Sequence, residues 1–419
     1  MSPEANLYAL VVGGALVVDF LLGLVADGLN LRALRSELPD ALRGVYTPEE
    51  FRRSQDYTRV RTRFGRIESM FHLAIFVGFW LLGGFGWLDG WTRSLGLGTV
   101  VTGLVFVSAL VVAKSILGSP FRIYSTFVIE ERFGFNRTTW KTFLLDAVKG
   151  ALLGALLGLP ILAAVLWFFD RAGSLAWLYC WLALSTFTLA LNAVFPTWIL
   201  PLFNRFEPLE EGELRSALSD YARSVGFALS GLFVIDGSRR SSRANAFFAG
   251  FGRNKRVALF DTLVESHTVP ELVAVMAHEV GHYKRGHIIK GLVLSVVNSG
   301  VVFYLLSIFL AHQGLFAAFG VAEPSVHAGL VFFGMLYAPI EMALSLGINA
   351  LLRRHEFEAD RFAVDTTGEP RAMVTALEKL SADNLSNPTP HPFYVALHYS
   401  HPPLLQRLAA IEARIAERA

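Results

Sequence analysis

Seven long apolar runs constrain the fold of this chain more than any other feature of its sequence. They lie near residues 7–26, 69–89, 99–117, 148–169, 175–200, 291–311 and 327–352. Each is close to the roughly 20 residues that an α-helix needs to cross a bilayer. Hydrophobic residues make up 53% of the chain and charged residues only 17%, which is too apolar for a soluble protein of this length. The sequence therefore predicts a mainly α-helical, multi-pass membrane protein with seven transmembrane helices.

Charge and cysteine content exclude several classes of function. The formal net charge of +2 is too small to indicate binding to nucleic acid. The single cysteine, Cys180, lies in an apolar run, so an intrachain disulfide and a cysteine-based metal site are both excluded. The first apolar run has no basic segment before it and no convincing cleavage site after it. We expect it to be a retained anchor rather than a signal peptide.

The distribution of basic residues among the loops predicts the orientation in the membrane. The second loop has only Arg93, and the sixth loop, residues 312–326, has neither Lys nor Arg. The first loop has nine arginines, namely Arg32, Arg35, Arg43, Arg52, Arg53, Arg59, Arg61, Arg63 and Arg66. Basic loops stay in the cytoplasm, so the N-terminus is expected outside and the C-terminus inside.

The segment from His278 to His282 has the HExxH pattern typical of zinc hydrolases. On a helix, the two histidines lie one turn apart on the same face and can bind one metal ion. Glu279 lies beside them, placed to take a proton from a water molecule rather than to bind the metal. The simpler interpretation is a helical histidine pair that makes ordinary hydrogen bonds.

A zinc hydrolase site needs a third protein ligand and leaves a fourth position open. The best candidate is Glu356, directly after the seventh apolar run, and Asp360 lies four residues later on the same helical face. Asp360 would accept a hydrogen bond from a ligand histidine. Glu358 points elsewhere on the helix and is expected to face solvent. The alternative for Glu356 and Asp360 is a solvated helix face.

Two stretches are polar enough to fold in water, residues 202–290 and 353–419, and both are predicted to be cytoplasmic. The first is expected to contain an amphipathic helix at 210–225 and strands at 232–235, 245–249 and 256–260. Thr268 and Glu271 resemble a capping box that opens the HExxH helix. The predicted organisation is five transmembrane helices in 1–201, a first catalytic part in 202–290, two transmembrane helices in 291–352 and a second catalytic part in 353–419.

Together these motifs resemble the type I CAAX prenyl endopeptidases, integral-membrane zinc proteases of the gluzincin group that cleave isoprenylated proteins. The similarity extends in order from about residue 120 to residue 410. It includes FVIEERFGFN at 127–136, NAFF at 245–248, NKRVALFDTL at 254–263 and YSHPP at 399–403. Two positions depart from the family pattern: Phe247 replaces an expected Tyr, and Gln406 replaces a usual Glu.

The resemblance implies one zinc ion and a set of site residues. Its expected ligands are His278, His282 and Glu356. Glu279 would be the general base, and Asp360 the partner of a ligand histidine. The oxyanion would be stabilised by His401 and Arg407, and the substrate backbone would be bound along the strand at Asn245 and Ala246. From the residues alone, a structural role for His401 in its Ser-His-Pro-Pro turn stays open.

From the residues, the two polar stretches are expected to form one split catalytic domain with a small β element. The resemblance adds that the helices enclose a chamber, with zinc at its cytoplasmic end. Asp19, Lys114 and Glu341 are ionisable residues inside predicted spans, where contact with lipid is costly. They would suit a hydrated interior, although some of them could instead be snorkelling groups or local pairs.

The expected function is zinc-dependent proteolysis by a monomer in the bilayer. Both ligand-bearing helices run directly out of membrane spans, so we expect membrane-associated substrates, and the resemblance implies prenylated C-terminal CaaX peptides. The nearest alternative is a quality-control zinc protease that acts on damaged membrane proteins. A transporter or channel with a structural zinc is a further alternative, but the open coordination position argues against it.

Overall fold

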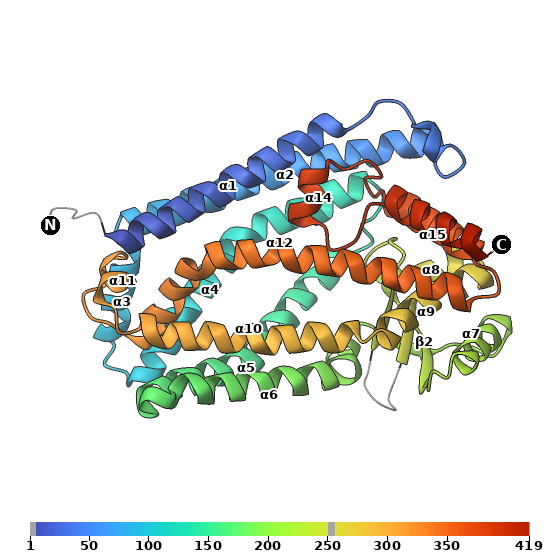
Figure 1. The fold of residues 1–419 in the computed structure, drawn as a ribbon. Coiled ribbons are helices and arrows are strands. Elements are labelled where there is room, and N and C mark those ends of the chain that lie inside the picture. Colours follow the sequence, from blue (N-terminus) through green and yellow to red (C-terminus); the bar gives the residue numbers. More distant parts are fainter. Residues whose placement is uncertain (1–5, 250–255, 419) are drawn as a thin grey trace.

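In the computed structural model, which describes residues 6–249 and 256–418, a bundle of long helices carries a small mixed domain at one end (Figure 1). Seven helices in the described residues are long and apolar enough to cross a membrane, as predicted. They are α1 (Leu7–Ala33), α2 (Pro48–Leu81), α4 (Thr99–Tyr124), α5 (Trp140–Arg171), α6 (Ala176–Val194), α10 (His287–Phe309) and α12 (Val326–Thr366). Two of them are extended by π-helical turns, α4 by Ser125–Glu130 and α6 by Phe195–Ile199.

The second transmembrane helix departs most from its predicted bounds. The prediction of one span over 69–89 was wrong at its end, because α2 stops at Leu81 and a separate helix, α3 (Gly84–Ser94), follows. Gly83 between them has a φ of 76°, a left-handed conformation that interrupts a helix and that glycine adopts without strain. At its other end, α2 begins 21 residues before the predicted span, so it carries arginines of the first loop on a helix.

Beyond the bundle, four short strands form a sheet in the order β1-β2-β4-β3. β2 (Gly231–Ile235) and β4 (Arg256–Phe260) are parallel, and the edge strands β1 (Phe206–Pro208) and β3 (Ala246–Ala249) pair antiparallel with them. The three predicted strands are confirmed. β1 was not predicted, because three residues that end in a proline show no alternation. The predicted amphipathic helix is α7 (Glu213–Ser224).

One hydrophobic core joins the two polar stretches. Leu272 and Val280 of α9 (Val269–Lys284) are buried in one cluster with Ala363 of α12 and Met373 of α13 (Arg371–Asp383). Phe51 at the start of α2 belongs to the same cluster, so part of the predicted first loop packs into the same hydrophobic core. The remaining helices of this region are α8 (Asp261–Ser266), α14 (Pro392–His398) and α15 (Leu404–Arg418). This core supports the prediction that residues 202–290 and 353–419 form one split domain.

The opposite end of the bundle is closed by aromatic packing. Phe319 and Phe332 are stacked with ring centroids 4.1 Å apart, and Phe85 of α3 meets Phe332 edge-on. A short helix, α11 (Gln313–Ala317), lies beside them in the sixth loop. All three rings are buried, so this cluster holds the loops of the far end against the bundle.

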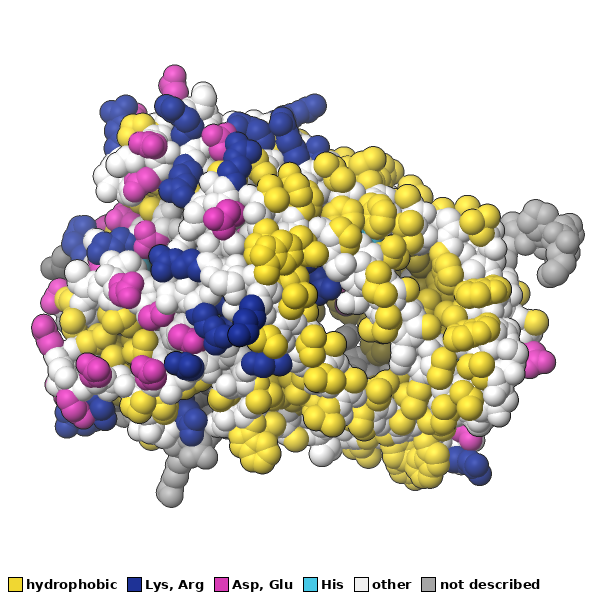
Figure 2. Space-filling model, turned by 180° about the vertical axis from the view of Figure 1, so that it is seen from behind, with side chains coloured by type: hydrophobic (Ala, Val, Ile, Leu, Met, Phe, Trp, Pro, Cys, Tyr) yellow, Lys and Arg dark blue, Asp and Glu magenta, His cyan; other side chains and the backbone are white. Residues whose placement is uncertain are grey.

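A cavity of about 1030 Å³ lies between α1, α2, α4, α12 and α14. Its lining includes Asp19, Lys114 and Glu341, together with an ion pair in which Arg66 Nε lies 3.2 Å from Asp27 Oδ2. Asp19, Lys114 and Glu341, which lie in three different predicted spans, therefore share one interior space. Figure 2 also shows an opening between hydrophobic side chains on the membrane-spanning part of the surface.

The start of α9 is fixed by the predicted capping box. The backbone N–H of Thr268 donates to Glu271 Oε2 at 2.8 Å, and Lys379 Nζ of α13 donates to the same oxygen at 2.7 Å. Burial by itself would raise the pKa of Glu271, but these hydrogen bonds lower it below its ordinary value of 4.5. Glu271 thus ties the first turn of α9 to α13.

Glu271→Gln is expected to lower the free energy of unfolding at pH 7 by about 1 kcal/mol, because it removes a charged capping partner. The folded pKa lies below the unfolded one, so this contribution is complete above about pH 4.5 and is lost as pH falls through the folded value. Denaturation curves at several pH values measure it, with Glu265→Gln on the exposed face of α8 as control. A difference that stays constant below pH 4.5 would contradict this role.

Candidate metal centre

The candidate site lies where α9 packs against the C-terminal part of α12. At Gly281, a side-chain Cβ would lie 3.1 Å from the Cα atom of Ala359, so only glycine allows the helices to come this close without a shift. Ala277 and Val280 of α9 and Ala359 of α12 are fully buried in this contact. The close approach brings the HExxH histidines of one helix opposite Glu356 of the other.

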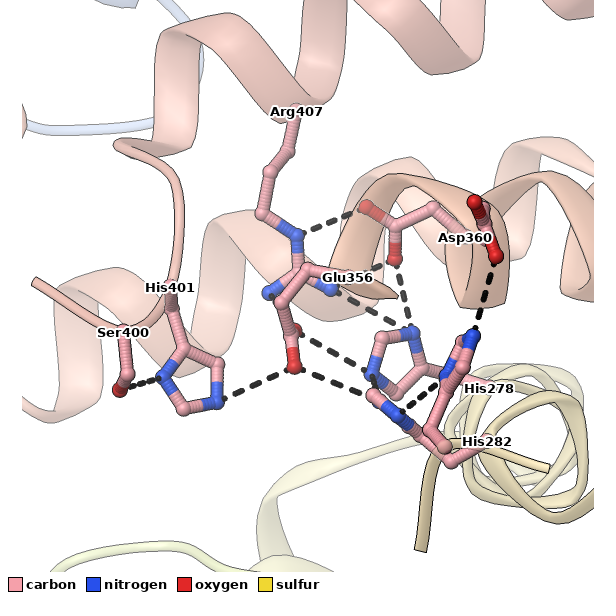
Figure 3. Close-up of polar contacts among 9 residues, drawn as sticks. His278, His282, Glu356, Asp360, Ser400, His401 and Arg407 are labelled. Atoms are coloured by element: carbon pink, nitrogen blue, oxygen red, sulfur yellow. Dashed lines mark hydrogen bonds and ion pairs between the residues drawn. The ribbon is translucent and has the colours of Figure 1, made fainter. Parts of the chain in front are cut away.

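His278 and His282 face each other from consecutive turns of α9, with their Nε2 atoms 3.1 Å apart (Figure 3). Glu356 reaches both, because its Oε2 lies 3.5 Å from His278 Nε2 and its Oε1 lies 3.3 Å from His282 Nε2. One ligand atom from each of the three residues falls within a group no wider than 4.8 Å. The structure therefore brings the three predicted ligands together.

These residues fit a metal ion by their chemistry. Glu356 Oε2 is buried and makes no hydrogen bond, because its nearest donors, His278 Nε2 and Arg407 Nη1, lie 3.5 and 3.6 Å away; a bound cation would satisfy this oxygen. Two imidazole nitrogens and one carboxylate oxygen are a common set of zinc-ligating atoms in catalytic sites. His278, His282 and Glu356 can together hold a divalent ion of this kind.

Asp360 and Arg407 form a buried ion pair behind His278. Asp360 Oδ1 lies 2.8 Å from His278 Nδ1, and the guanidinium of Arg407 donates to both carboxylate oxygens at 2.6 and 2.8 Å. A bond from Nδ1–H to Asp360 leaves the Nε2 lone pair of His278 free for a metal. Arg407 Nη1 lies 3.6 Å from Glu356 Oε2, so this cation lies between the two carboxylates.

The site shifts the proton affinities of His278 and Glu279. Burial disfavours the charged form of His278, but Asp360 and Glu356 outweigh it and raise the pKa to about 9 in the metal-free chain. Burial also raises the pKa of Glu279 above its ordinary value of 4.5, and His278 and His282 oppose this only in part. A raised pKa makes Glu279 a better proton acceptor than an ordinary carboxylate.

His401 approaches the same group from the turn before α15. Its Nε2 lies 3.4 Å from Glu356 Oε1, and its Nδ1 lies 2.9 Å from the hydroxyl of Ser400 (Figure 3). Its side chain is 66% exposed, unlike the buried Glu356. His401 therefore borders the ligand group from its solvent side.

Asn245 and Ala246 lie at the edge of the sheet. Ala246 opens β3, which pairs only with β4 within residues 6–249 and 256–418, and Asn245 precedes it with an exposed side chain. The backbone carbonyl of Asn245 accepts a hydrogen bond from the N–H of Phe260 at 3.0 Å. Within the NAFF and NKRVALFDTL motifs, Asn254, Lys255 and the side chains of Phe247 and Phe248 lie outside what the structure describes.

Two histidines beside the site, His287 and His355, were not predicted from the sequence, and neither was the contact of Glu358 with one of them. His287 Nδ1 lies 3.1 Å from His282 Nδ1, and its ring stacks on that of His355. The expectation that Glu358 faces solvent holds only in part, because its side chain is 32% exposed but its carboxylate lies 3.1 Å from His287 Nε2. The sequence does show a third histidine, His287, five residues after HExxH. Only the tertiary structure shows that the start of α10 places its ring against His282.

Comparison with known proteins identifies two family matches in the chain. Residues 29–205 match the family described as CAAX prenyl protease N-terminal, five membrane helices, and residues 208–415 match peptidase family M48. The CAAX prenyl protease 1 homolog of Arabidopsis thaliana is 35% identical over 412 residues, which cover 96% of each chain. The homolog of Mus musculus is 32% identical over 90% of this chain and 89% of its own.

The fold agrees with these matches. The crystal structure of S. mikatae Ste24p aligns with a TM-score of 0.92 at 31% identity, and the alignment covers 97% of this chain and 99% of that one. The membrane bundle with its chamber and the metallopeptidase body are thus shared. The chain belongs to the CAAX prenyl protease 1 family of membrane-integral M48 metallopeptidases.

Proposed function

We propose that this peptidase uses one zinc ion to cleave membrane-held polypeptides, with prenylated C-terminal CaaX proteins as its substrate class. The observation that carries the proposal is the convergence of His278, His282 and Glu356 on one buried point beside the membrane bundle. Their donor set is the one expected for a catalytic zinc with an open coordination position. The names of the relatives, CAAX prenyl proteases, support the substrate class.

Bound zinc would polarise the scissile carbonyl and increase the acidity of water at the site. Glu279 takes the proton of the attacking water and passes it to the leaving amine, a role that its raised pKa favours. His401, the exposed imidazole next to Glu356, donates to the oxyanion. Arg407 adds positive charge from behind Glu356 while Asp360 holds His278 as a ligand.

The substrate backbone is proposed to add as a further strand along β3. β3 is an edge strand of the sheet, and such a strand presents unpaired backbone groups to an extended peptide. Asn245 and Ala246 stand at its start and would bind the substrate there. This arrangement holds a peptide by its backbone and leaves side-chain selection to other surfaces.

Glu279→Gln is expected to keep the bound metal and to lower turnover by about 10²–10⁴-fold, because it removes the proton acceptor without removing a ligand. Peptide cleavage and metal content are measured on the same purified sample. Glu265→Gln, an exposed change on neighbouring α8, serves as the control for a lost carboxylate. Near wild-type cleavage by Glu279→Gln would remove Glu279 from the mechanism.

The placement of the site favours substrates that are attached to the membrane. α12 runs without interruption from a membrane span through Glu356, and α9 is separated from the span α10 only by Arg285 and Gly286. A CaaX peptide with a prenyl group is therefore expected to be cleaved with a kcat/KM at least tenfold above that of its unprenylated counterpart, an effect of about 1.4 kcal/mol. Equal cleavage of both would contradict lipid recognition and favour a quality-control protease.

We further propose that the N-terminus is outside, that the catalytic domain and C-terminus are cytoplasmic, and that the chain acts as a monomer. Lys and Arg side chains gather over the catalytic end in Figure 2, as the orientation rule requires of a cytoplasmic face. Protease protection of terminal tags in sealed vesicles tests the orientation. Light scattering of the detergent-solubilised protein tests the monomer, and a dimer mass would contradict it.

A further inference from the structure

A chain of polar side chains extends from His282 away from the other ligands. α9 ends near Gly286, which has a φ of 69°, and α10 begins directly at His287. This turn brings the His287 ring back to His282, with their Nδ1 atoms 3.1 Å apart. On its other side, His287 Nε2 lies 3.1 Å from Glu358 Oε2 of α12.

Only one arrangement of protons satisfies both contacts when His282 is a neutral ligand through Nε2. A neutral imidazole carries one N–H and one lone pair, so Nδ1 of His282 must carry the hydrogen and donate it. Nδ1 of His287 must then accept, which places the hydrogen of His287 on Nε2. That nitrogen has its acceptor in Glu358, and the chain of donors and acceptors is complete.

The ring of His287 is held in place by α12. It stacks on His355 with centroids 3.9 Å apart and planes within 9°, and only 4% of its side chain is exposed. Glu358 is oriented in turn by Arg354, whose Nε donates to its other oxygen at 3.0 Å. His355 directly precedes the ligand Glu356, so the same turn of α12 supplies one ligand and supports the partner of another.

The two histidine ligands consequently have different partners. His278 donates directly to the carboxylate of Asp360, which is paired with Arg407. His282 instead faces the imidazole of His287, and the carboxylate of Glu358 lies on the far side of that imidazole. Partners of this kind orient a ligand and typically change metal affinity by about 10–100-fold.

We propose that His287 is a positioning residue that holds His282 in its metal-binding tautomer and orientation, with Glu358 as the terminal acceptor. This inference rests on the proposed role of His282 as a metal ligand. His287 touches neither substrate nor metal in this scheme, and it acts entirely through His282. Its loss should therefore weaken the metal site without removing any ligand.

The test compares His287→Phe with His287→Asn in the full-length protein. Phe keeps a planar ring against His355 but has no acceptor, so zinc affinity is expected to fall about 10–100-fold. Asn carries an oxygen near the position of Nδ1 and is expected to restore affinity to within a few-fold of wild type. Affinity is measured by competition with a zinc chelator, and the absorption spectrum of cobalt-loaded protein reports on ligand geometry.

His282→Ala separates failure of this inference from failure of the proposed function. If His282→Ala still binds zinc as the wild type does, the proposed metal site is wrong. If His282→Ala loses zinc while His287→Phe binds it with wild-type affinity and an unchanged cobalt spectrum, the metal site stands and the positioning role is overturned.

A second pair of variants decides the question if His287→Phe does not fold. Glu358→Gln keeps a carbonyl oxygen that can accept from His287 Nε2, whereas Glu358→Leu has no acceptor. We expect Glu358→Leu to bind zinc more weakly than Glu358→Gln. Equal affinities of the two variants would overturn it.

Discussion

The contact between α9 and α12 is the interaction on which the candidate metal centre depends. Gly281 lets the two backbones approach, and a Cβ there would meet both the Cα and the carbonyl oxygen of Ala359. Each helix is rigid over a turn, so the distance between backbones sets the distance between the histidine nitrogens and Glu356. Ala277, Val280 and Ala359 near this point are fully buried, as expected of a closely packed helix contact.

Burial makes the charges of the site interdependent. An unpaired carboxylate in such a position costs several kcal/mol, and Asp360 avoids this cost through its double hydrogen bond with Arg407. His278 and His282 direct their Nδ1 atoms to partners outside the ligand group. The carboxylate of Glu356 faces both Nε2 atoms, Oε2 toward His278 and Oε1 toward His282, and Oε2 makes no hydrogen bond. The surrounding side chains thus orient three possible ligand atoms toward a position where one cation could bind.

The continuity of α12 links this chemistry to the membrane. Its 41 residues include a membrane-spanning part, lining residues of the cavity such as Glu341, and the candidate ligand Glu356. The cavity is bordered by α14 as well, and Arg353 of α12 donates to the backbone carbonyl of Tyr399, two residues before His401. The bundle, the cavity and the metal centre therefore share one structural element, so a substrate held in the bilayer is close to the site.

The sequence by itself determined the seven spans, the three candidate ligands and the capping box of α9. Each of these signals is local: apolar length, the spacing of residues on one helical turn, or a pair three residues apart. The tertiary structure alone decided that Glu358 binds His287, that Arg407 is paired with Asp360, and that charged residues of three spans line one cavity. These features depend on which helices meet and how closely, and packing between distant segments leaves no periodic trace in the chain.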